Sequence, residues 1–314
     1  MGILFLIIFS FVEWNCENLF DCLHDSLKND TEFLPEGSRK WTPSKYRNKV
    51  NHIAQALASC WEDEVGDYRL PDMVALCEVE NHHVMRAITE ESPLRTVHYE
   101  YVMTDSPDPR GIDVALMYNP KSFRLVCHYA IRTGGRLKER PSRDILYVKG
   151  LDSIIDTLHV LVVHAPSRYG GELETRPYRM AVAEQLIETV DSIEHSSLQA
   201  RIIIAGDFND YSSDASLHLL SEGGLTEVSL HARGIHGAEG TYKYRGKWDS
   251  LDHILVSGSL LRQVRNVRVH DAPFLLEDDP IYGGYQPCRT FLNYRYREKG
   301  FSDHLPLVMK LKIQ

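Results

Sequence analysis

The sequence predicts an α/β fold in which helices pack outside β-sheets. Short apolar runs with the length of buried strands recur from one end of the chain to the other. Two longer segments between them carry apolar residues at helical spacing. Such a mixture of strands and a few helices indicates sheets that are covered by helices.

The predicted strands follow one another along the whole chain. The first is the strongly apolar stretch 1–11, which leads directly into Trp14-Asn15. Further strands are predicted near 73–77, 99–103, 112–118, 158–163, 202–205, 251–257 and 305–312. A length of 314 residues corresponds to about two domains of typical size. No Pro/Gly/Ser-rich linker or charge block divides the strands, so we expect a single domain over residues 1–314.

Two helices are predicted. The first follows Thr42-Pro43, which looks like an N-cap followed by proline at the first helical position. Its apolar face would contain Tyr46, Val50, Ile53, Ala54 and Leu57. The second follows Pro177, with Met180, Ala183, Leu186, Ile187 and Val190 on one face. The stretch 262–300 has little periodicity and predicts long ordered loops near the site, where function tends to concentrate.

The charge balance limits the possible partners. The formal net charge is −9, which disfavours tight non-specific binding to duplex nucleic acid, because such binding needs a basic surface that releases counterions. A phosphate-bearing substrate remains compatible with this charge, since a metal ion and a few local arginines outweigh the global balance.

The N-terminus and the cysteines bear on the location of the protein. The apolar stretch 1–11 is too short to span a bilayer and lacks the basic start and the cleavage site of a signal peptide. We therefore expect no transmembrane segment. The six cysteines form no C-x-x-C pair, which favours free thiols and a reducing compartment. We expect a cytoplasmic monomer, secreted only if the apolar N-terminus acts as a signal.

Acidic, amide and histidine side chains stand at the edges of several apolar runs. Gly206-Asp207-Phe208-Asn209 carries them where a strand ends, whereas Asp252-His253 and Asp303-His304 come where later strands begin. If the later strands run antiparallel to the first, these ends and starts meet on one rim. That rim would gather carboxylates and a histidine, which is the chemistry of a metal-assisted hydrolase.

Three earlier residues fit the same rim. Glu78 follows one apolar run, His164 ends another, and Asn15 follows the N-terminal strand. The set is rich in oxygen ligands and contains no H-E-x-x-H motif, so it favours a hard divalent cation over zinc.

With these motifs the chain resembles the endonuclease/exonuclease/phosphatase superfamily, which is deoxyribonuclease I-like. The matching residues, in family order, are Asn15 in Trp-Asn-Cys, Glu78, His164 in Val-His-Ala-Pro-Ser, Asp207 and Asn209 in Gly-Asp-Phe-Asn, Asp252 in Leu-Asp-His, and Asp303 and His304 in Ser-Asp-His. The segments Asn-Leu-Phe-Asp and Arg-Gly-Ile-Asp-Val look most like its uncharacterised bacterial branch. Cys77 stands where the family usually has the Gln of a Gln-Glu pair.

The resemblance implies a four-layer α/β/β/α sandwich of two mixed β-sheets flanked by helices. It also implies hydrolysis of a phosphate ester with Mg2+ or Mn2+. Glu78 would be the main metal carboxylate, and Asn15 and Asp303 would complete the metal site, because oxygen ligands suit these ions. His304 paired with Asp252 would be the catalytic histidine, since a carboxylate on one imidazole nitrogen fixes the tautomer and favours the charged form.

The remaining roles concern the water and the phosphate. Asp207 would orient or deprotonate the attacking water, Asn209 would hold a phosphate oxygen, and His164 would stabilise phosphoryl charge or assist the leaving group. The sequence leaves open whether Asp207 or the paired histidine is the base. Arg168 is the favoured arginine for phosphate contact, because it follows the His164 segment and its planar fork suits phosphate oxygens. The other candidates are Arg110, Arg143, Arg176 and Arg179.

These expectations lead to a metal-dependent phosphoric ester hydrolase, first of all a phosphodiesterase or nuclease that directs a metal-assisted water at phosphorus. The partner would be a phosphate ester, with nucleic acid among the candidates. A phosphomonoesterase acting on a small or lipid-linked phosphate is the first alternative, and the acidic charge favours small substrates. A non-catalytic binding protein on the same fold would have lost a metal acid or a histidine, and none is missing.

Overall fold

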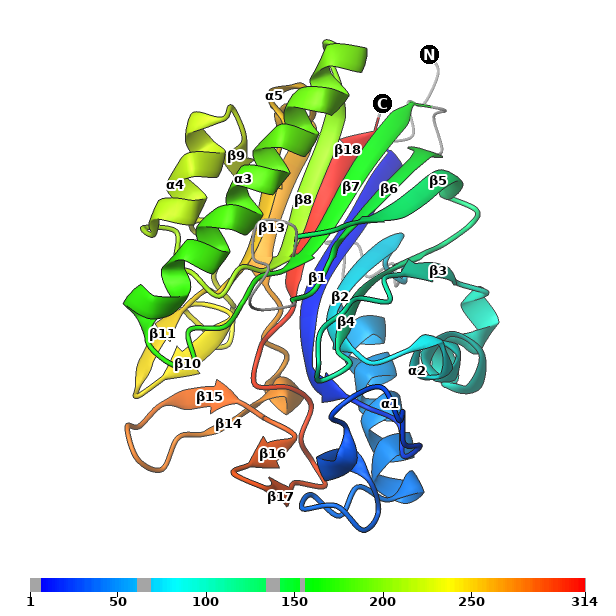
Figure 1. Ribbon diagram of the computed structural model, residues 1–314, viewed down its shortest axis with the longest axis vertical. Helices are drawn as coiled ribbons and strands as arrows, with labels where there is room; N and C mark the ends of the chain where they lie inside the picture. The colour runs from blue at the N-terminus through cyan, green and yellow to red at the C-terminus, as the bar shows by residue number, and fades with distance from the viewer. Residues whose placement is uncertain (1–6, 61–68, 134–141, 153–155, 314) are drawn as a thin grey trace.

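The computed structural model describes residues 7–60, 69–133, 142–152 and 156–313 (Figure 1). Two six-stranded mixed sheets form its centre. The first sheet has the order β13-β18-β1-β2-β4-β3, with β1 (Ile7–Leu19), β2 (Met73–Val79), β3 (Glu100–Met103), β4 (Asp113–Tyr118), β13 (Val264–Val269) and β18 (Leu307–Ile313). The second has the order β5-β6-β7-β8-β12-β9, with β5 (Phe123–Ile131), β6 (Ile145–Asp152), β7 (Thr157–His164), β8 (Arg201–Asp207), β9 (Thr226–Glu227) and β12 (Asp252–Val256).

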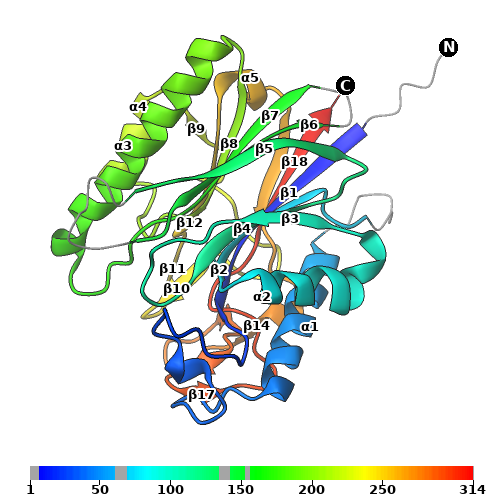
Figure 2. The ribbon, with the colours of Figure 1, turned by 45° about the vertical axis from the view of Figure 1, so that its right-hand side comes forward.

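Helices cover the outer faces of both sheets. They are α1 (Pro43–Ser59), α2 (His82–Arg86), α3 (Glu172–Ser196), α4 (Ala215–Glu222) and α5 (Gly258–Leu261), with the short turns η1 (Thr31–Phe33), η2 (Ala87–Glu91), η3 (Pro93–Val97) and η4 (Pro273–Leu275). In Figures 1 and 2, α3 and α4 lie outside β7 and β8, whereas α1 and α2 lie beyond the first sheet. The predicted α/β/β/α sandwich is confirmed.

Side-chain alternation along the strands builds two cores. In β7 and β8, Val160, Val162, Ile203 and Ala205 belong to the core that also contains the first sheet. The intervening residues Leu161, Val163, Ile202 and Ile204 belong to a second core with α3. Because successive side chains point to opposite faces, β7 and β8 are buried on both sides.

The two predicted long helices are present, and the predicted N-terminal strand extends further than expected. α1 begins at Pro43, directly after the predicted N-cap Thr42. α3 begins at Glu172, five residues earlier than the Pro177 start that the sequence suggested. β1 is described from Ile7 and continues to Leu19; the first six residues of the predicted strand lie outside the described residues.

The prediction for residues 262–300 needs correction. This stretch contains β13, which pairs antiparallel with β18 at the edge of the first sheet. It also contains two small hairpins. In the first, β14 (Leu276–Asp278) pairs with β15 (Tyr285–Pro287), and in the second, β16 (Phe291–Leu292) pairs with β17 (Arg295–Tyr296). Another hairpin, formed by β10 (Tyr242–Tyr244) and β11 (Lys247–Asp249), precedes this stretch. β5, which was also missed, is mostly exposed. Edge strands that bury little have a weak apolar signal, so periodicity does not reveal them.

Candidate active site

Three polar side chains lie next to one another on one rim of the second sheet, at the ends of β7 and β8 and the start of β12. His164 pairs with Asp207 in the parallel register of β7 and β8, and Asp252 pairs with Asp207 in the antiparallel register of β12 and β8. All three continue the series of side chains that face the first sheet, as 160–162–164, 203–205–207 and 252–254–256. The antiparallel arrangement that the sequence required is therefore present.

A close approach of two strands sets the spacing of this rim. Gly206 has a φ of +148°, and a Cβ atom there would lie 1.8 Å from the carbonyl oxygen of Val163. Only glycine fits such an approach without displacing a backbone. The glycine of the Gly-Asp-Phe-Asn motif thus lets β7 and β8 stay in register up to His164 and Asp207.

His304 and Asp252 form a buried pair. His304 Nδ1 lies 2.7 Å from Asp252 Oδ2, and the hydroxyl of Thr241 donates to the same oxygen at 2.5 Å. Trp14 Nε1 donates to the carbonyl oxygen of His304 at 2.9 Å and fixes its backbone. Burial by itself lowers the pKa of His304, but the Asp252 carboxylate outweighs burial and raises this pKa well above its usual range. The imidazole is therefore held in its charged form.

Asp207 occupies the centre of the rim. Its two oxygens accept hydrogen bonds from the backbone N–H of Asn209 at 2.8 Å and from Asn15 Nδ2 at 2.9 Å. Burial and the neighbouring Asp252 carboxylate raise the pKa of Asp207 to about 7, although the charged His304 opposes this rise. A carboxylate with this pKa exchanges a proton near neutral pH, which suits a general base.

His164 stands on the other side of Asp207. Its Nε2 lies 3.7 Å from Asp207 Oδ2 and 3.9 Å from Glu78 Oε1, and its buried Nδ1 has no hydrogen-bond partner among the described residues. Burial and the charges of Arg143 and Arg110 lower the pKa of His164 well below its usual range. The two histidines of the site therefore differ in charge, with His164 neutral.

The oxygens expected to hold a metal come from the first sheet and from the segment before β18. Glu78 lies at a bulge with φ +60°, and its Oε2 accepts the N–H of Asn18 at 2.7 Å. Glu78 Oε1 and the Asp303 carboxylate accept no hydrogen bond from the described part of the chain, and both line one cleft. Within the described ranges Asn15 Oδ1 accepts one hydrogen bond, from the N–H of Glu17 at 2.9 Å, which leaves one lone pair of this oxygen without a donor there. This donor set fits a hard divalent cation.

Asp207, Asp252 and His304 also approach one another closely, with one ligand atom of each within 4.8 Å of the others. A metal there would need a neutral imidazole. The Asp252 carboxylate keeps His304 protonated instead. These three side chains are therefore better suited to proton transfer than to metal binding.

One cleft, with a volume of about 700 Å³, is lined both by expected metal ligands and by residues of the Asp207–His304 group. The predicted site residues that line it are Glu78, His164, Asp207, Asn209, Asp303 and His304. Asp252 and Asn15 lie just behind it, through their bonds to His304 and Asp207. Residues that the sequence did not assign to the site complete the wall, among them Asp108, Tyr169 and Tyr242. All but one of the predicted residues are thus brought together.

The exception is Arg168. It forms ion pairs with Glu172 at 2.8 Å and Asp214 at 3.2 Å and stacks over Tyr211, and it is absent from the cleft wall. These ion pairs hold the Arg168 side chain against the start of α3 and Asp214, although its neighbours Ser167 and Tyr169 line the cleft.

Two other arginines line the cleft. Arg143 is engaged by the carbonyl oxygens of His164 and Ala165 and by Asp108 at 3.0 Å. Arg110 is exposed, lines the cleft and, within the described part of the chain, donates a hydrogen bond to Asn18 Oδ1 alone, which leaves most of its guanidinium N–H groups without a protein acceptor. Arg179, another candidate, is buried against Asp210. Arg110 is therefore the available cation.

Further polar residues lie under the site without having been predicted. Glu13 is fully buried, and neither of its oxygens has a hydrogen-bond partner among the described residues. Burial, followed by the charges of Asp252 and Asp207, raises the pKa of Glu13 well above the usual range. Glu17 is buried as well, and burial raises its pKa to about 7. The sequence does carry a signal for Glu13, because this acidic residue interrupts the apolar run Phe11-Val12-Glu13-Trp14 at the end of the predicted N-terminal strand.

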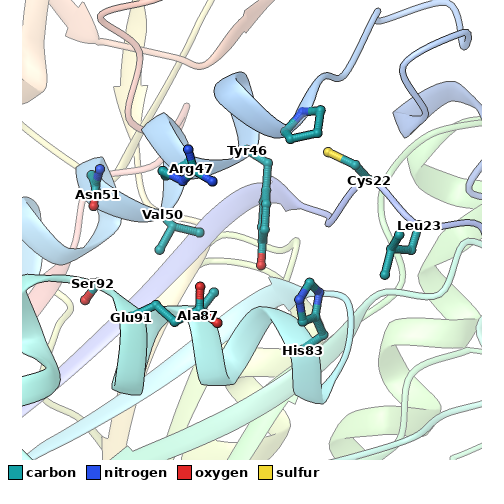
Figure 3. A pocket seen from close by; sticks show the side chains of 11 residues that line it. Cys22, Leu23, Tyr46, Arg47, Val50, Asn51, His83, Ala87, Glu91 and Ser92 are labelled. Carbon is teal, nitrogen blue, oxygen red and sulfur yellow. The ribbon is translucent and has the colours of Figure 1, made fainter.

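A second hollow, of about 580 Å³, lies between α1 and the α2–η2 segment (Figure 3). Tyr46 stands between the two helical segments, with His83 on one side of its ring and Arg47 and Asn51 on the other. Its described lining contains none of the predicted site residues. The candidate chemistry is therefore confined to the cleft between the sheets.

Comparison with known proteins shows the family to which the chain belongs. Residues 10–313 match the Endonuclease/Exonuclease/phosphatase family, and the chain belongs to that family. Its members are hydrolases that act on phosphoesters, generally with a divalent metal. No match was found among curated proteins.

Several solved structures share the fold. An endonuclease/exonuclease/phosphatase family protein from Bacteroides thetaiotaomicron is 16% identical, with a TM-score of 0.62, over 98% of this chain and 99% of that chain. A mannosyl-6-phosphatase from Bacteroides thetaiotaomicron is 16% identical, with a TM-score of 0.61, over 97% and 100%. Truncated TDP2 from Caenorhabditis elegans is 17% identical, with a TM-score of 0.56, over 98% and 98%. At these identities the likeness concerns the fold. No described helix has the length and apolar character needed to cross a membrane.

Proposed function

We propose that the protein is a divalent-metal-dependent phosphodiesterase of the nuclease type. The observation that carries this proposal is the meeting of Asp207 with the Asp252–His304 pair on one side of a cleft and with the unengaged oxygens of Glu78 and Asp303 on the other. A bound Mg2+ or Mn2+ would polarise the phosphoryl oxygens and stabilise developing negative charge. Glu78, Asp303 and Asn15 would hold it.

The protein's own residues would then have separate tasks. Asp207, with its pKa of about 7, would orient a water molecule and take its proton. His304, held charged by Asp252, would stabilise negative charge on a phosphoryl oxygen. His164 and Asn209 would contact the remaining phosphate oxygens, and Asn209 is held at a φ of +50° with its amide nitrogen on the carbonyl oxygen of Ala165. Both pKa values are raised: Asp207 is brought close to neutral pH, where it can take a proton, whereas His304 stays protonated and has no free nitrogen lone pair to act as a base.

The residues that line the cleft support a diester. A diester carries a group on each side of phosphorus, and the cleft wall contains Arg110, Tyr169 and Tyr242 in addition to the candidate catalytic residues. Tyr169 is 87% exposed, so its ring offers a free face for a planar group such as a nucleobase.

A phosphomonoesterase is the second candidate. Arg110 is a cation with unused donors, which suits the additional charge of a monoester dianion. The net charge of −9 also disfavours long polyanionic substrates. The mannosyl-6-phosphatase among the similar structures lends support to this candidate.

The test is a hydrolysis screen with Mg2+, with Mn2+ and after exhaustive chelation. The substrates are bis-p-nitrophenyl phosphate, p-nitrophenyl phosphate, plasmid DNA, RNA and phospholipid. We expect metal-dependent hydrolysis with the diester favoured. Full activity after chelation would contradict the metal requirement, and cleavage of the monoester alone would favour the second candidate.

A further inference from the structure

We propose that Lys49 is a positioning residue of the active site, and that its buried ammonium fixes the segment 288–304, which carries Asp303 and His304, against β1, which carries Asn15. This inference rests on the proposed function where it assigns these three residues to the site. Lys49 lies on α1, is 0% exposed, and has no part in the cleft wall.

Lys49 bridges the two ends of a loop, at Thr290 and Phe301, which together are called the loop neck below. Its Nζ donates to Thr290 Oγ1 and to the carbonyl oxygen of Phe301, and Thr290 Oγ1 also donates to that carbonyl oxygen at 2.9 Å. Thr290 precedes the β16–β17 hairpin and Phe301 follows it. An ammonium group donates up to three hydrogen bonds and accepts none. Lys49 thereby joins both ends of the hairpin loop to α1.

The same neck is held from β1 by a buried carboxylate. Glu17 accepts the backbone N–H of Thr290 at 2.5 Å and that of Phe291 at 3.0 Å. Burying an ammonium costs several kcal/mol unless opposite charge and hydrogen bonds compensate it. Burial lowers the pKa of Lys49, and the carboxylates of Glu17 and Asp303 oppose this and favour the charged ammonium. Lys49 and Glu17 therefore hold Thr290 from opposite sides.

A short path leads from this neck to the site. The N–H of Phe301 donates to the carbonyl oxygen of Cys288 at 2.6 Å, and the next residue, Ser302, donates its hydroxyl to the carbonyl oxygen of Asn15 at 2.7 Å. The N–H of His304 in turn donates to Ser302 Oγ at 3.1 Å. Movement at Phe301 therefore displaces Asp303 and His304 relative to Asn15.

Helix α1 also contacts the segment 288–304 through side chains other than Lys49. His52 stacks on Phe301 with ring centroids 4.5 Å apart, and its Nδ1 lies 2.7 Å from the carbonyl oxygen of Gly300. Asn48 Nδ2 donates to the carbonyl oxygen of Glu298 at 2.9 Å. These contacts would survive the loss of Lys49, so a Lys49→Met variant keeps the docking of the loop while it loses the charge and the hydrogen bonds at the neck.

The first test is hydrogen–deuterium exchange on the metal-free full chain, comparing wild type with Lys49→Met. We expect exchange in residues 288–304 to become about tenfold faster, the change expected from losing one or two net hydrogen bonds. The matched control is Arg201→Met. Arg201 is also buried and pairs with Asp152 at 2.6 Å, but it begins β8 at the end opposite to Asp207. The control should leave 288–304 unchanged, and unchanged protection of 288–304 in Lys49→Met would overturn the proposal.

The second readout is calorimetric titration with Mn2+. We expect Lys49→Met to bind Mn2+ about tenfold more weakly, as for the loss of a group that supports metal ligands, and Arg201→Met to bind it like wild type. Unchanged affinity in Lys49→Met would also overturn the proposal. A wild type that binds no Mn2+ would count against the proposed function, and the exchange experiment would still decide the role of Lys49.

Thr290→Val covers the case in which Lys49→Met fails to fold. It removes the bridging hydroxyl, keeps the volume and leaves the charge of Lys49 in place. We expect the same faster exchange in 288–304 to a smaller degree, and protection equal to wild type would overturn the proposal.

Discussion

His304 Nδ1 lies 2.7 Å from Asp252 Oδ2, although the two residues come from different sheets and are 52 positions apart. Asp252 begins β12 in the second sheet, and His304 precedes β18 in the first. The pair therefore bridges the two layers of the sandwich at the rim where the cleft opens.

We expect His304→Ala to lower kcat by about 10²–10³-fold, the range for losing one group that stabilises developing negative charge. Asp252→Asn should also be severe, because it removes the carboxylate that keeps the imidazole charged. If the two act as one unit, the double variant is little worse than the worse single variant. The measurement is a double-mutant cycle on the best phosphate ester from the screen, with circular dichroism to verify folding. Fully multiplicative effects would mean that the two residues work separately.

The pH dependence should follow Asp207. Its pKa is raised to about 7, so the carboxyl is protonated below pH 7 and becomes an available base above it. We expect kcat/KM to rise as pH passes through about 7, and His304, whose pKa is raised, to stay charged across this range. Asp207→Asn should lose most of the activity together with this limb of the profile. A limb of unchanged position in the residual activity of that variant would assign the base elsewhere.

Glu78→Gln should weaken metal binding while the fold is kept, because an amide is a poorer ligand than a carboxylate for a hard cation. We expect an apparent Mg2+ or Mn2+ requirement raised by at least the ~10–100-fold that loss of a supporting group costs. Titration of activity against metal concentration measures this. Glu80→Gln is the matched control, since Glu80 is two positions away but accepts the N–H of Asp21 and is not part of the cleft wall. A larger effect of Glu80→Gln than of Glu78→Gln on the metal requirement would assign the metal carboxylate to Glu80 instead.

Substitutions of Arg110 and Arg168 test which of the two arginines contacts the substrate. Arg110→Gln should raise KM about tenfold or more, because a charge-assisted hydrogen bond to phosphate contributes roughly 1.5–3 kcal/mol. Arg168→Gln should leave KM close to wild type, since that side chain pairs with Glu172 and Asp214. Steady-state kinetics on one ester would check both, and the reverse order of effects would restore Arg168 as the substrate contact.

Gly206→Ala should destabilise the protein, because the new methyl group meets the Val163 carbonyl oxygen and the φ of +148° strains any other residue. We expect a loss of roughly 1–3 kcal/mol in the free energy of unfolding and a loss of activity through the displaced Asp207. Gly258→Ala is the control, since a Cβ atom there meets nothing within 4 Å. Thermal melts followed by circular dichroism measure both, and equal melting temperatures for the two variants would contradict this account of the rim.

The sequence predicted which residues gather on one rim because strand ends carry a local signal. Asp207, Asp252 and His164 directly adjoin apolar runs, and buried strands have a pattern that a single chain displays. Their common rim followed from assuming an antiparallel strand, which β12 satisfies. Arg168 was misplaced for the opposite reason, since it lies beyond a strand end, where the path of the loop decides the direction of a side chain.

What the sequence determined by itself was the α/β class, the two long helices and the set of strand-edge acids and histidines, because each depends on residues near one another in the chain. The tertiary structure alone decided which histidine is charged, since the charge depends on Asp252 for His304, and on burial and then Arg143 for His164. It also decided the role of Lys49, whose partners Thr290 and Phe301 are more than 240 positions away. Charge states and buried hydrogen bonds depend on distances of a few ångströms in space, and only the packing of distant segments sets those distances.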